Sequence, residues 1–318
     1  MDRIFKRALV PSDFKGSRLD KAAATIFSDF SRSQLKTWIK SGTLTLGGMK
    51  VEPKTRLSGG EELVLDAQLD SVIPVESEDI PLTVVHQDKS ILVIDKPPGL
   101  VVHPGAGNPS GTLQNALLNL DESLSILPRA GIVHRLDKDT SGLLLIARTM
   151  GVRNRLVAEL ERREIQRQYE GVCQGVATGG GKVEAPISRH PKDRLKMAVL
   201  TGGRPALTHY RVMEKFRAHT HLSLTLNTGR THQIRVHLAH IRMPLVGDPV
   251  YGGRPRFPPK PGDEIRLLLQ EFSRQALHAT RLAFHHPEDG KLVSYRSPLP
   301  DDIRMLLEIL RKDANAGD

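Results

Sequence analysis

The sequence predicts an α+β protein in which a mixed, mainly antiparallel β-sheet flanked by helices follows a small α/β domain. Short β-rich runs alternate with helical stripes in the second part of the chain, and loops rather than helices often join neighbouring runs. No strand leads into a glycine-rich fingerprint or a P-loop, which argues against a doubly wound nucleotide-binding fold. The stretch 67–81 carries four acids, two prolines and no Lys or Arg, so we interpret it as a linker between two domains.

The first domain is expected to contain two helices and a few short strands. Apolar residues recur at helical spacing in two stripes, Leu19, Ala22, Ala23, Ile26 and Phe27, and then Leu35, Trp38 and Ile39. Gly42 follows the second stripe as a C-cap. Short strands are expected at 43–46 and 61–65, and the first of them ends in a Gly47–Gly48 turn.

The second helix of this domain carries a row of basic residues, which we call the basic row. Arg32, Lys36 and Lys40 recur every four residues and therefore lie on one helical face, away from the apolar stripe. One interpretation is a solvated surface. The other is an RNA-binding face, which the basic composition of the chain favours because such a row matches the spacing of phosphates.

β-rich runs dominate after the linker, and helical stripes lie between them. The expected strands are 91–94, 143–147, 169–176, 208–212 and 222–226. The expected helices lie around 113–120, 156–160 and 234–241. The predicted organisation is a first domain over 1–66 with its core at 17–66, the linker, a second domain over 82–312, and a flexible tail over 313–318.

Composition narrows the class of protein. The chain has 46 Lys and Arg against 36 Asp and Glu, a formal net charge of +10, which favours a nucleic-acid partner. No basic amphipathic helix and no 18-residue apolar run supports a membrane partner, and residues 1–7 lack the apolar core of a signal peptide. Cys173 is the only cysteine, which excludes an internal disulfide and a thiolate zinc cluster. We expect a cytoplasmic protein and, by default, a monomer.

The loop at 134–142 (HRLDKDTSG) is the most informative segment. It places two acids, two bases and an imidazole within six residues and then runs into the apolar strand at 143–147. Because charged groups avoid burial unless they are paired, such a loop suggests a reactive group at the mouth of a pocket. A polar turn before a core strand explains the local composition equally well.

Other chemistries fit the sequence less well. His237 and His240 are three residues apart, but no HExxH pattern and few carboxylates accompany them, so we expect no metal site. No GxSxG elbow is present for a Ser-His-Asp hydrolase. Asp137 and Asp139 offer two carboxylates for glycoside hydrolysis, but their basic neighbours suit a polyanion better than a neutral sugar.

Four segments of the second domain together carry a family resemblance: DKPPGLVVHPGAGN (95–108), HRLDKDTSG (134–142), REIQRQYEGVCQG (163–175) and NTGRTHQIRVHLAH (227–240). In order and spacing they resemble the RluA-type pseudouridine synthases over nearly the whole of 82–300. The stretches PISRHP and VGDPVYGGRPR extend the likeness. Residues 17–66, through SRSQLKTWIKSGTLTLGG, resemble an S4-type RNA-binding domain.

The resemblance implies isomerisation of specific uridines to pseudouridine in large-subunit (23S) ribosomal RNA. The expected substrate is the helix 69 stem-loop, and the modification is expected to support assembly of the large subunit. The N1–C1′ bond breaks, the uracil rotates and C5 bonds to C1′. No group enters or leaves and no redox change occurs, so no cofactor is expected. The alternatives are a sibling synthase acting on other 23S uridines and a non-catalytic RNA-binding assembly factor.

The resemblance also implies roles for individual residues. Asp137 in HRLD matches the family's essential aspartate, which either attacks C1′ or removes the 2′ proton. Arg235 in HQIR matches the arginine that pairs with this aspartate. Tyr169 matches the tyrosine that stacks on the uracil and is a candidate for removing the C5 proton at the end of the reaction. Its phenol is a poor base at its ordinary pKa of about 10, so that step would need a water relay or an altered pKa.

Further residues are expected to hold the substrate. Arg135 resembles the residue that fills the space left by the flipped base, and Ile234 the one that packs beneath the uracil. His134 and Arg230 are further candidates for substrate contacts. Together with the basic row, Lys138 and Arg189 are candidates for contacts with RNA phosphates.

Overall fold

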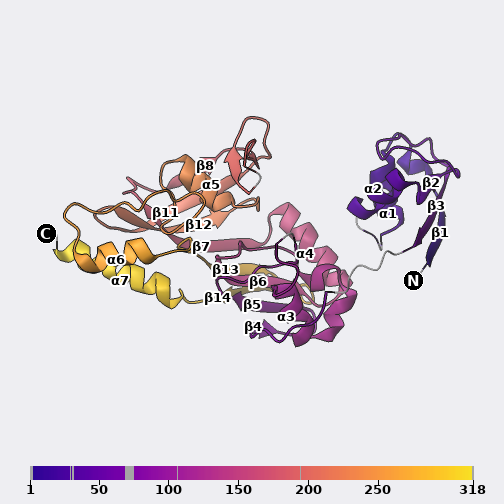
Figure 1. Cartoon of the computed structure of the whole chain (residues 1–318). Coiled ribbons are helices and arrows are strands. Elements are labelled where there is room, and N and C mark those ends of the chain that lie inside the picture. The colour runs from indigo at the N-terminus through magenta and orange to yellow at the C-terminus, as the bar shows by residue number, and fades with distance from the viewer. Residues whose placement is uncertain are drawn as a thin grey trace. The chain divides into compact units, whose positions relative to one another are not determined.

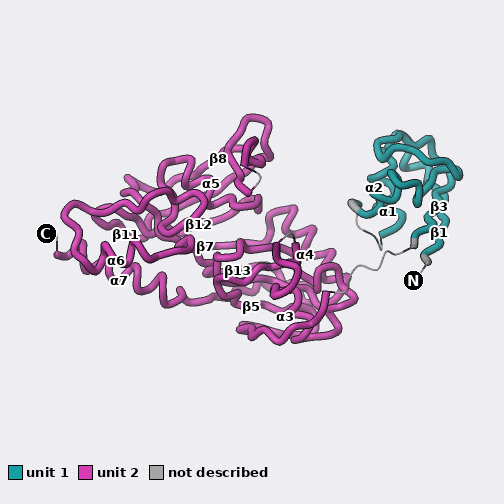
Figure 2. The backbone as a smooth tube through the Cα atoms, viewed as in Figure 1, with its two compact units in different colours: residues 1–74 teal, residues 75–318 magenta. Residues whose placement is uncertain are grey.

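The computed structural model describes residues 3–28, 30, 32–68, 75–105, 107–193 and 195–316. The chain divides into two compact units, Met1–Pro74 and Val75–Asp318 (Figure 2). Each unit buries its own hydrophobic core.

The first unit combines two α-helices with a three-stranded antiparallel sheet of order β1-β3-β2 (Figure 1). Its elements are β1 (Arg3–Leu9), a 3-10 turn (Ser12–Phe14), α1 (Leu19–Ile26), α2 (Arg32–Ser41), β2 (Leu44–Leu46) and β3 (Glu62–Gln68). Both predicted apolar stripes supply the core, with Leu19, Leu35 and Ile39 fully buried. Gly42 takes a φ of 88° directly after α2, a left-handed conformation that ends a helix at low cost.

Strand β1 lies outside the elements that the sequence predicted. It pairs with β3 along its whole length, so that Ala8 lies opposite Leu63. Basic residues at Lys6 and Arg7 weaken its apolar alternation, and that alternation is the signal on which strand prediction depends.

The stretch predicted as a linker is partly folded at both ends. Ala67 is fully buried in β3, and residues 75–81 belong to the second unit. Glu78 donates its backbone N–H to the carbonyl of Asn115 at 3.1 Å and accepts the N–H of Gly111 at 2.9 Å through its carboxylate. Glu78, one of the four acids that predicted a linker, therefore holds the loop at Gly111 of the second unit in place. Residues 69–74 lie outside the described residues.

The second unit is built on a nine-stranded sheet of order β4-β5-β6-β13-β7-β12-β11-β8, with β14 beside β13. Its strands are β4 (Thr83–Gln87), β5 (Ile91–Lys96), β6 (Ser141–Ala147), β7 (Gln166–Gln174), β8 (Gly181–Glu184), β11 (Leu207–Lys215), β12 (His219–Leu226), β13 (Leu277–His285) and β14 (Leu292–Arg296). In the described residues β6 and β13 pair in parallel, and the other neighbouring pairs of this sheet are antiparallel. The predicted mixed, mainly antiparallel α+β class is confirmed.

Five α-helices accompany this sheet among the described residues: α3 (Leu113–Leu120), α4 (Met150–Arg162), α5 (Gln233–His240), α6 (Asp263–Glu271) and α7 (Asp301–Ala316). Short 3-10 segments lie at Glu122–Ile126 and Pro128–Gly131, and β9 (Ile187–Arg189) pairs with β10 (Met197–Val199) as a separate ribbon. The helices predicted around 113–120, 156–160 and 234–241 are confirmed as α3, α4 and α5.

The central strands are apolar without interruption because side chains cover both faces of the sheet. In β5, Ile91 and Val93 face the cluster that contains Leu156 of α4. Leu92 and Ile94 face the opposite cluster, to which α3 and α5 contribute. Strand β6 alternates between the same two clusters, and all of its residues are buried. The loop before β6 is thereby anchored to the most deeply buried part of the unit.

Helices α6 and α7 lie beside each other (Figure 1) and share a core cluster with Val172 of β7. The sequence analysis predicted neither helix. Helix α7 continues to Ala316, four residues into the expected tail 313–318, and Asp313 within it accepts a hydrogen bond from Arg217 at 2.9 Å. No helix among the described residues is both long and apolar enough to cross a membrane.

Gly142 allows β6 and β13 to approach each other closely. Its φ is 111°, and a Cβ atom added there would lie 2.4 Å from the carbonyl oxygen of Ala279. We therefore expect Gly142→Ala to lower the free energy of unfolding by about 3 kcal/mol or more, through backbone strain and overlap with β13. Urea unfolding followed by circular dichroism measures this loss.

Gly151 provides the matched control, because a Cβ there meets nothing within 4 Å and the residue lies in the first turn of α4. Gly151→Ala should be neutral or slightly stabilising. Equal stability of the two variants would contradict the close approach of β6 to β13.

Candidate active site

Asp137 lies in the loop between the 3-10 segment at 128–131 and β6. The buried side chain of Lys96 holds this loop in place. The ammonium of Lys96, at the end of β5, donates to the carbonyls of Pro97 at 2.7 Å, Leu100 at 3.0 Å and Lys138 at 2.8 Å. Three acceptors use all three N–H groups of an ammonium, so the side chain ties the backbone next to Asp137 to β5. Burial lowers the pKa of Lys96 to about 7, although the charges of Asp139 and Asp137 oppose this shift.

Arg235 of α5 joins two carboxylates. Its Nη1 donates to Oδ2 of Asp137 at 3.0 Å, while its Nε and Nη2 donate to Asp248 at 2.7 and 2.9 Å. Asp248 in turn accepts the backbone N–H groups of Val250 and Tyr251, both at 2.9 Å. The bidentate pair fixes the guanidinium plane, and the third nitrogen, Nη1, then fixes the position of the Asp137 carboxylate.

Charge and burial are balanced within this trio. The side chain of Arg235 is 5% exposed and that of Asp248 is fully buried, whereas that of Asp137 is 16% exposed. Burial acts to lower the pKa of Arg235, but its hydrogen bonds to Asp248 raise that pKa above the usual value. Burial acts to raise the pKa of Asp248, but Arg235 holds it below the usual value. The arginine stays charged, and Asp137 is the carboxylate that solvent can reach.

The start of α5 is built to aim Arg235 at this loop. Gln233 accepts from the hydroxyl of Thr228 at 2.7 Å and from the N–H of Arg230 at 3.0 Å, which closes the loop before the helix. His232 takes a left-handed φ of 56° at the N-cap, and its Nε2 lies 3.8 Å from Asp137. Its Nδ1 lies 2.8 Å from the hydroxyl of Tyr251. Two side chains at the start of α5, His232 and Arg235, therefore lie beside the Asp137 carboxylate.

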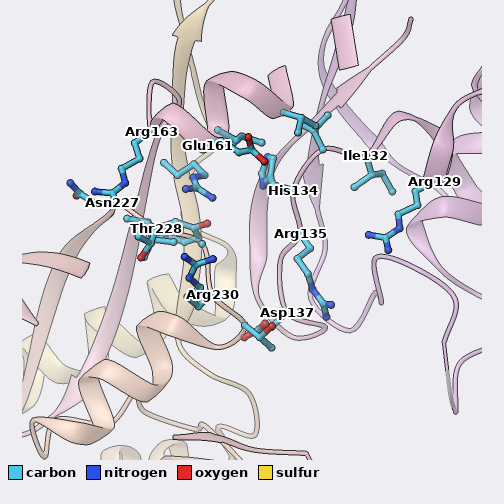
Figure 3. A pocket seen from close by; sticks show the side chains of 18 of the residues that line it. Arg129, Ile132, His134, Arg135, Asp137, Glu161, Arg163, Asn227, Thr228 and Arg230 are labelled. Carbon is cyan, nitrogen blue, oxygen red and sulfur yellow. The ribbon is translucent and has the colours of Figure 1, made fainter. Parts of the chain in front are cut away.

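Asp137 and Tyr169 line a cavity of about 510 Å³. Five arginines line it as well, against the two carboxylates of Asp137 and Glu161: Arg129, Arg135, Arg163, Arg167 and Arg230. Figure 3 shows Arg135 and Arg230 on either side of Asp137. A cavity of this size and charge fits one nucleotide with its phosphates.

A smaller adjoining cavity of about 50 Å³ brings the predicted site residues together. Its lining includes the predicted residues Arg135, Asp137, Tyr169, Arg230, Ile234 and Arg235. They come from segments up to about a hundred residues apart, since Arg235 and Asp137 are 98 positions apart in the sequence.

Tyr169 lies in β7 opposite Leu224 of β12 and is 5% exposed. Burial raises the pKa of its phenol, and the charge of Asp137 adds to this shift while that of Arg167 opposes it. The phenol therefore keeps its proton near neutral pH, and the residue is a largely buried part of the cavity lining.

His134 lines the larger cavity but is held by the sheet. Its Nε2 accepts the backbone N–H of Leu145 at 3.1 Å, so the proton of the neutral ring is on Nδ1. Burial and then the charge of Arg167 lower the pKa of His134 to about 3. The side chain is thus a neutral group at the cavity wall, and its Nδ1 has no hydrogen-bond partner among the described residues.

The predicted RNA-contacting residues come from both units. Lys138 is exposed next to Asp137, while Arg189 is exposed on β9. The basic row lies on α2 of the first unit, and all three of its residues are exposed. Arg32 also pairs with the buried carboxylate of Asp20 at 2.9 Å. This contact gives Arg32 a structural role in addition to any role in binding.

Sequence reasoning assigned no role to Asp248, Lys96, His232 or Tyr251. Asp248 and Tyr251 lie in VGDPVYGGRPR and Lys96 in DKPPG, two of the stretches that carried the family resemblance. An acid inside an otherwise apolar VGDPV stretch was a usable signal, because a buried carboxylate requires a partner. The sequence alone did not show that the partner is Arg235.

The fold and this site define an enzyme that acts on RNA. Residues 90–240 match the family model described as RNA pseudouridylate synthase, and the chain belongs to that family of enzymes. Among solved structures, Human RNA Pseudouridylate Synthase Domain Containing 4 is 26% identical with a TM-score of 0.57, over 72% of this chain and 93% of that one.

Among curated relatives, the chain is similar to proteins named Ribosomal large subunit pseudouridine synthase D. The one from Xanthomonas campestris pv. campestris is 50% identical over 99% of this chain and 95% of its own length. The one from Escherichia coli strain K12 is 51% identical over 98% of this chain and 96% of its own length. The likeness therefore spans both units.

Proposed function

We propose that this enzyme converts uridines of large-subunit (23S) ribosomal RNA to pseudouridine, with the helix 69 stem-loop as its substrate. The name shared by the full-length relatives supports a large-subunit substrate. The catalytic part of this proposal is supported by the hydrogen-bonded chain Asp248–Arg235–Asp137. This chain presents one solvent-accessible carboxylate beside a buried tyrosine in a cationic cavity. In the cell we expect a cytoplasmic monomer that meets the RNA in the large subunit or its precursor.

In this proposal Asp137 is the catalytic carboxylate, and it acts at C1′ or at the 2′ proton of the flipped uridine. Arg235 holds that carboxylate in place. It stays bonded to Asp248 throughout, so no reorganisation is needed when the base enters. The N1–C1′ bond breaks, the uracil rotates while its face stays stacked on Tyr169, and C5 bonds to C1′. The raised pKa of the phenol argues for stacking, with water carrying away the C5 proton while N1, released from C1′, takes up a proton.

Arg135 is the residue that we assign to the space left in the RNA stem by the flipped base. Its side chain is exposed and lines both cavities, next to the loop that carries Asp137. A guanidinium stacks on neighbouring bases more readily than an ammonium does. Ile234 packs beneath the uracil, while His134 and Arg230 contact the nucleotide from the cavity wall.

Substrate choice is tested with purified protein and short RNA stem-loops. We expect pseudouridine to form in a helix 69 stem-loop at least about a hundredfold faster than in other 23S stem-loops of equal length, as read by carbodiimide-primer extension. Equal rates on all stem-loops would contradict the helix 69 assignment. Binding without any conversion would favour a non-catalytic assembly factor, and conversion of a different stem-loop would favour a sibling synthase.

We further propose that residues 1–66 form an S4-type RNA-binding domain, which docks on RNA shape and backbone through the basic row. Changing Arg32, Lys36 and Lys40 together to Gln should weaken RNA binding. It should also make the plot of log affinity against log salt shallower by about 2 to 3, because each lost phosphate contact removes about 0.7–0.9 from the slope. Filter binding across a salt series measures both quantities.

A matched control removes the same charge from the second unit. Lys182, Lys291 and Lys312 are 60%, 80% and 67% exposed, and changing all three to Gln lowers the net charge equally. This control should leave the salt slope within about one of the wild-type value. A basic-row variant with the wild-type slope would mean that the row is only a solvated surface.

A further inference from the structure

Three potential metal ligands converge beside the turn between β4 and β5. His86 is at the end of β4, Asp88 is in that turn, and His286 directly follows β13. The Nε2 atoms of the two imidazoles lie 2.8 and 3.0 Å from the same carboxylate oxygen, Oδ2 of Asp88. The cavity that contains Asp137 is lined by other residues.

The local backbone aims these groups at a common point. The register of β4 against β5 shifts between Val84 and His86, and such a bulge redirects the side chain that follows it. The other oxygen of Asp88 accepts the N–H groups of Ser90 at 2.7 Å and Ile91 at 2.8 Å, which fixes the carboxylate. These two hydrogen bonds orient the Asp88 carboxylate whether or not an ion is bound.

Contacts around the three ligands hold them in place. Nδ1 of His286 accepts the backbone N–H of Glu288 at 3.4 Å, and Oδ1 of Asp289 lies 3.7 Å from the same nitrogen. The His86 ring lies against Tyr295, with 4.9 Å between ring centroids. The hydroxyl of Ser90 donates to Glu288 at 2.6 Å, so the turn between β4 and β5 and the turn between β13 and β14 are already joined by one polar contact.

We propose that His86, Asp88 and His286 bind one divalent transition-metal ion, with Zn²⁺ as the best match, and that the ion clips the β4–β5 turn to the β13–β14 turn. Two imidazole nitrogens and one carboxylate suit Zn²⁺ better than Mg²⁺ or Ca²⁺, which prefer oxygen ligands. The two Nε2 atoms lie 2.8 and 3.0 Å from Oδ2 of Asp88, and all three donor atoms lie within 4.8 Å of one another. Tetrahedral bonds of about 2.1 Å place ligand atoms about 3.4 Å apart, so small side-chain movements suffice to receive an ion.

Binding changes the protonation of the two rings in a defined way. Without metal, each ring is bonded to Asp88 through Nε2. With metal, Nε2 is a ligand and the ring proton is on Nδ1, so Nδ1 of His286 gives up the N–H of Glu288, now at 3.4 Å, and donates toward Asp289, now at 3.7 Å. The side chains of His86, Asp88 and His286 are 34%, 27% and 13% exposed, so water can complete the coordination.

This site differs from the pair that the sequence analysis considered and rejected. His237 is fully buried, and its two ring nitrogens bond to the hydroxyl of Thr208 at 2.9 Å and the carbonyl of Ala185 at 3.0 Å. Neither nitrogen is available to a metal. The proposed ligands come from segments about 200 residues apart, so no sequence spacing could reveal them.

The test uses the full chain after removal of metal with EDTA. Equilibrium dialysis against low-micromolar Zn²⁺, with bound zinc counted by mass spectrometry, should give one equivalent per chain. His86→Gln and His286→Gln should each weaken this equivalent at least about tenfold. His285→Gln is the matched control, because His285 is exposed and is not one of the three clustered ligands. The absence of a tight equivalent, or full binding by His86→Gln, would overturn the proposal.

Thermal unfolding provides a second readout that is independent of RNA modification. Zn²⁺ should raise the melting temperature of the wild-type chain and of His285→Gln, and EDTA should reverse the rise. His86→Gln should show no rise, and its partly exposed position makes it the variant least expected to disturb folding. Zinc that binds the wild-type chain without any rise would contradict a role as a clip between the two turns.

Discussion

Asp137→Asn is expected to lower the rate of pseudouridine formation by at least about a thousandfold while leaving RNA affinity within about threefold. The amide has the size of the carboxylate, and its oxygen can still accept the hydrogen bond from Arg235, now 3.0 Å. What it lacks is the negative charge that reacts at C1′ or removes the 2′ proton. Single-turnover conversion of a helix 69 stem-loop measures the rate, and filter binding measures the affinity.

Asp139 supplies the matched control, because it is the other acid of the same loop. Its backbone carbonyl accepts from Arg274 at 3.1 Å, a contact that does not depend on its side chain. Asp139→Asn should therefore retain conversion within about tenfold of wild type. Modification retained by Asp137→Asn, or lost to the same extent by Asp139→Asn, would remove Asp137 from the catalytic role.

Arg235→Lys is expected to keep the charge but to lower the rate of conversion about a hundredfold, with little change in RNA affinity. An ammonium cannot hold two carboxylates in one plane, so the Asp137 side chain would no longer be fixed relative to the cavity. A misplacement of about 1 Å at a reacting group costs about a hundredfold in rate. Single-turnover rates and binding constants separate the two effects.

A double-mutant cycle tests whether Arg235 and Asp248 act as a unit. Asp248→Asn should slow conversion by itself, because it loosens the bidentate pair. The variant with both changes should be close to Arg235→Lys alone, since each change removes the same restraint on Asp137. Losses that multiply in the double variant would mean that Asp248 acts on catalysis by a separate route.

Much of the fold was predictable because strands and helices leave local patterns of apolar residues in the sequence. The apolar runs at 91–94 and 143–147 alternate between two core clusters, as expected for strands covered on both faces. The stripes that became α1 to α5 are visible at helical spacing. Strand β1 and helices α6 and α7 were not predicted, although α7 has apolar residues that pack in the same cluster as Val172.

The site was predictable only in part, for a physical reason. Motif likeness identified Asp137, Tyr169 and Arg235, and the structure brings them to the lining of one small cavity. Lys96 and Asp248 hold these groups in place through contacts that span 42 and 13 residues, and such contacts depend on the packing of the whole unit. Their residue types, a lysine and an acid inside apolar segments, are the trace that this packing leaves in the sequence.

We propose that this enzyme modifies helix 69 of 23S ribosomal RNA through Asp137. Pseudouridines can be mapped in 23S RNA from cells that lack the protein, and from the same cells supplied with wild type or with Asp137→Asn. We expect the pseudouridines of helix 69 to disappear without the protein, to return with wild type and to stay absent with Asp137→Asn. Helix 69 pseudouridines that persist without the protein, or that return with Asp137→Asn, would contradict it.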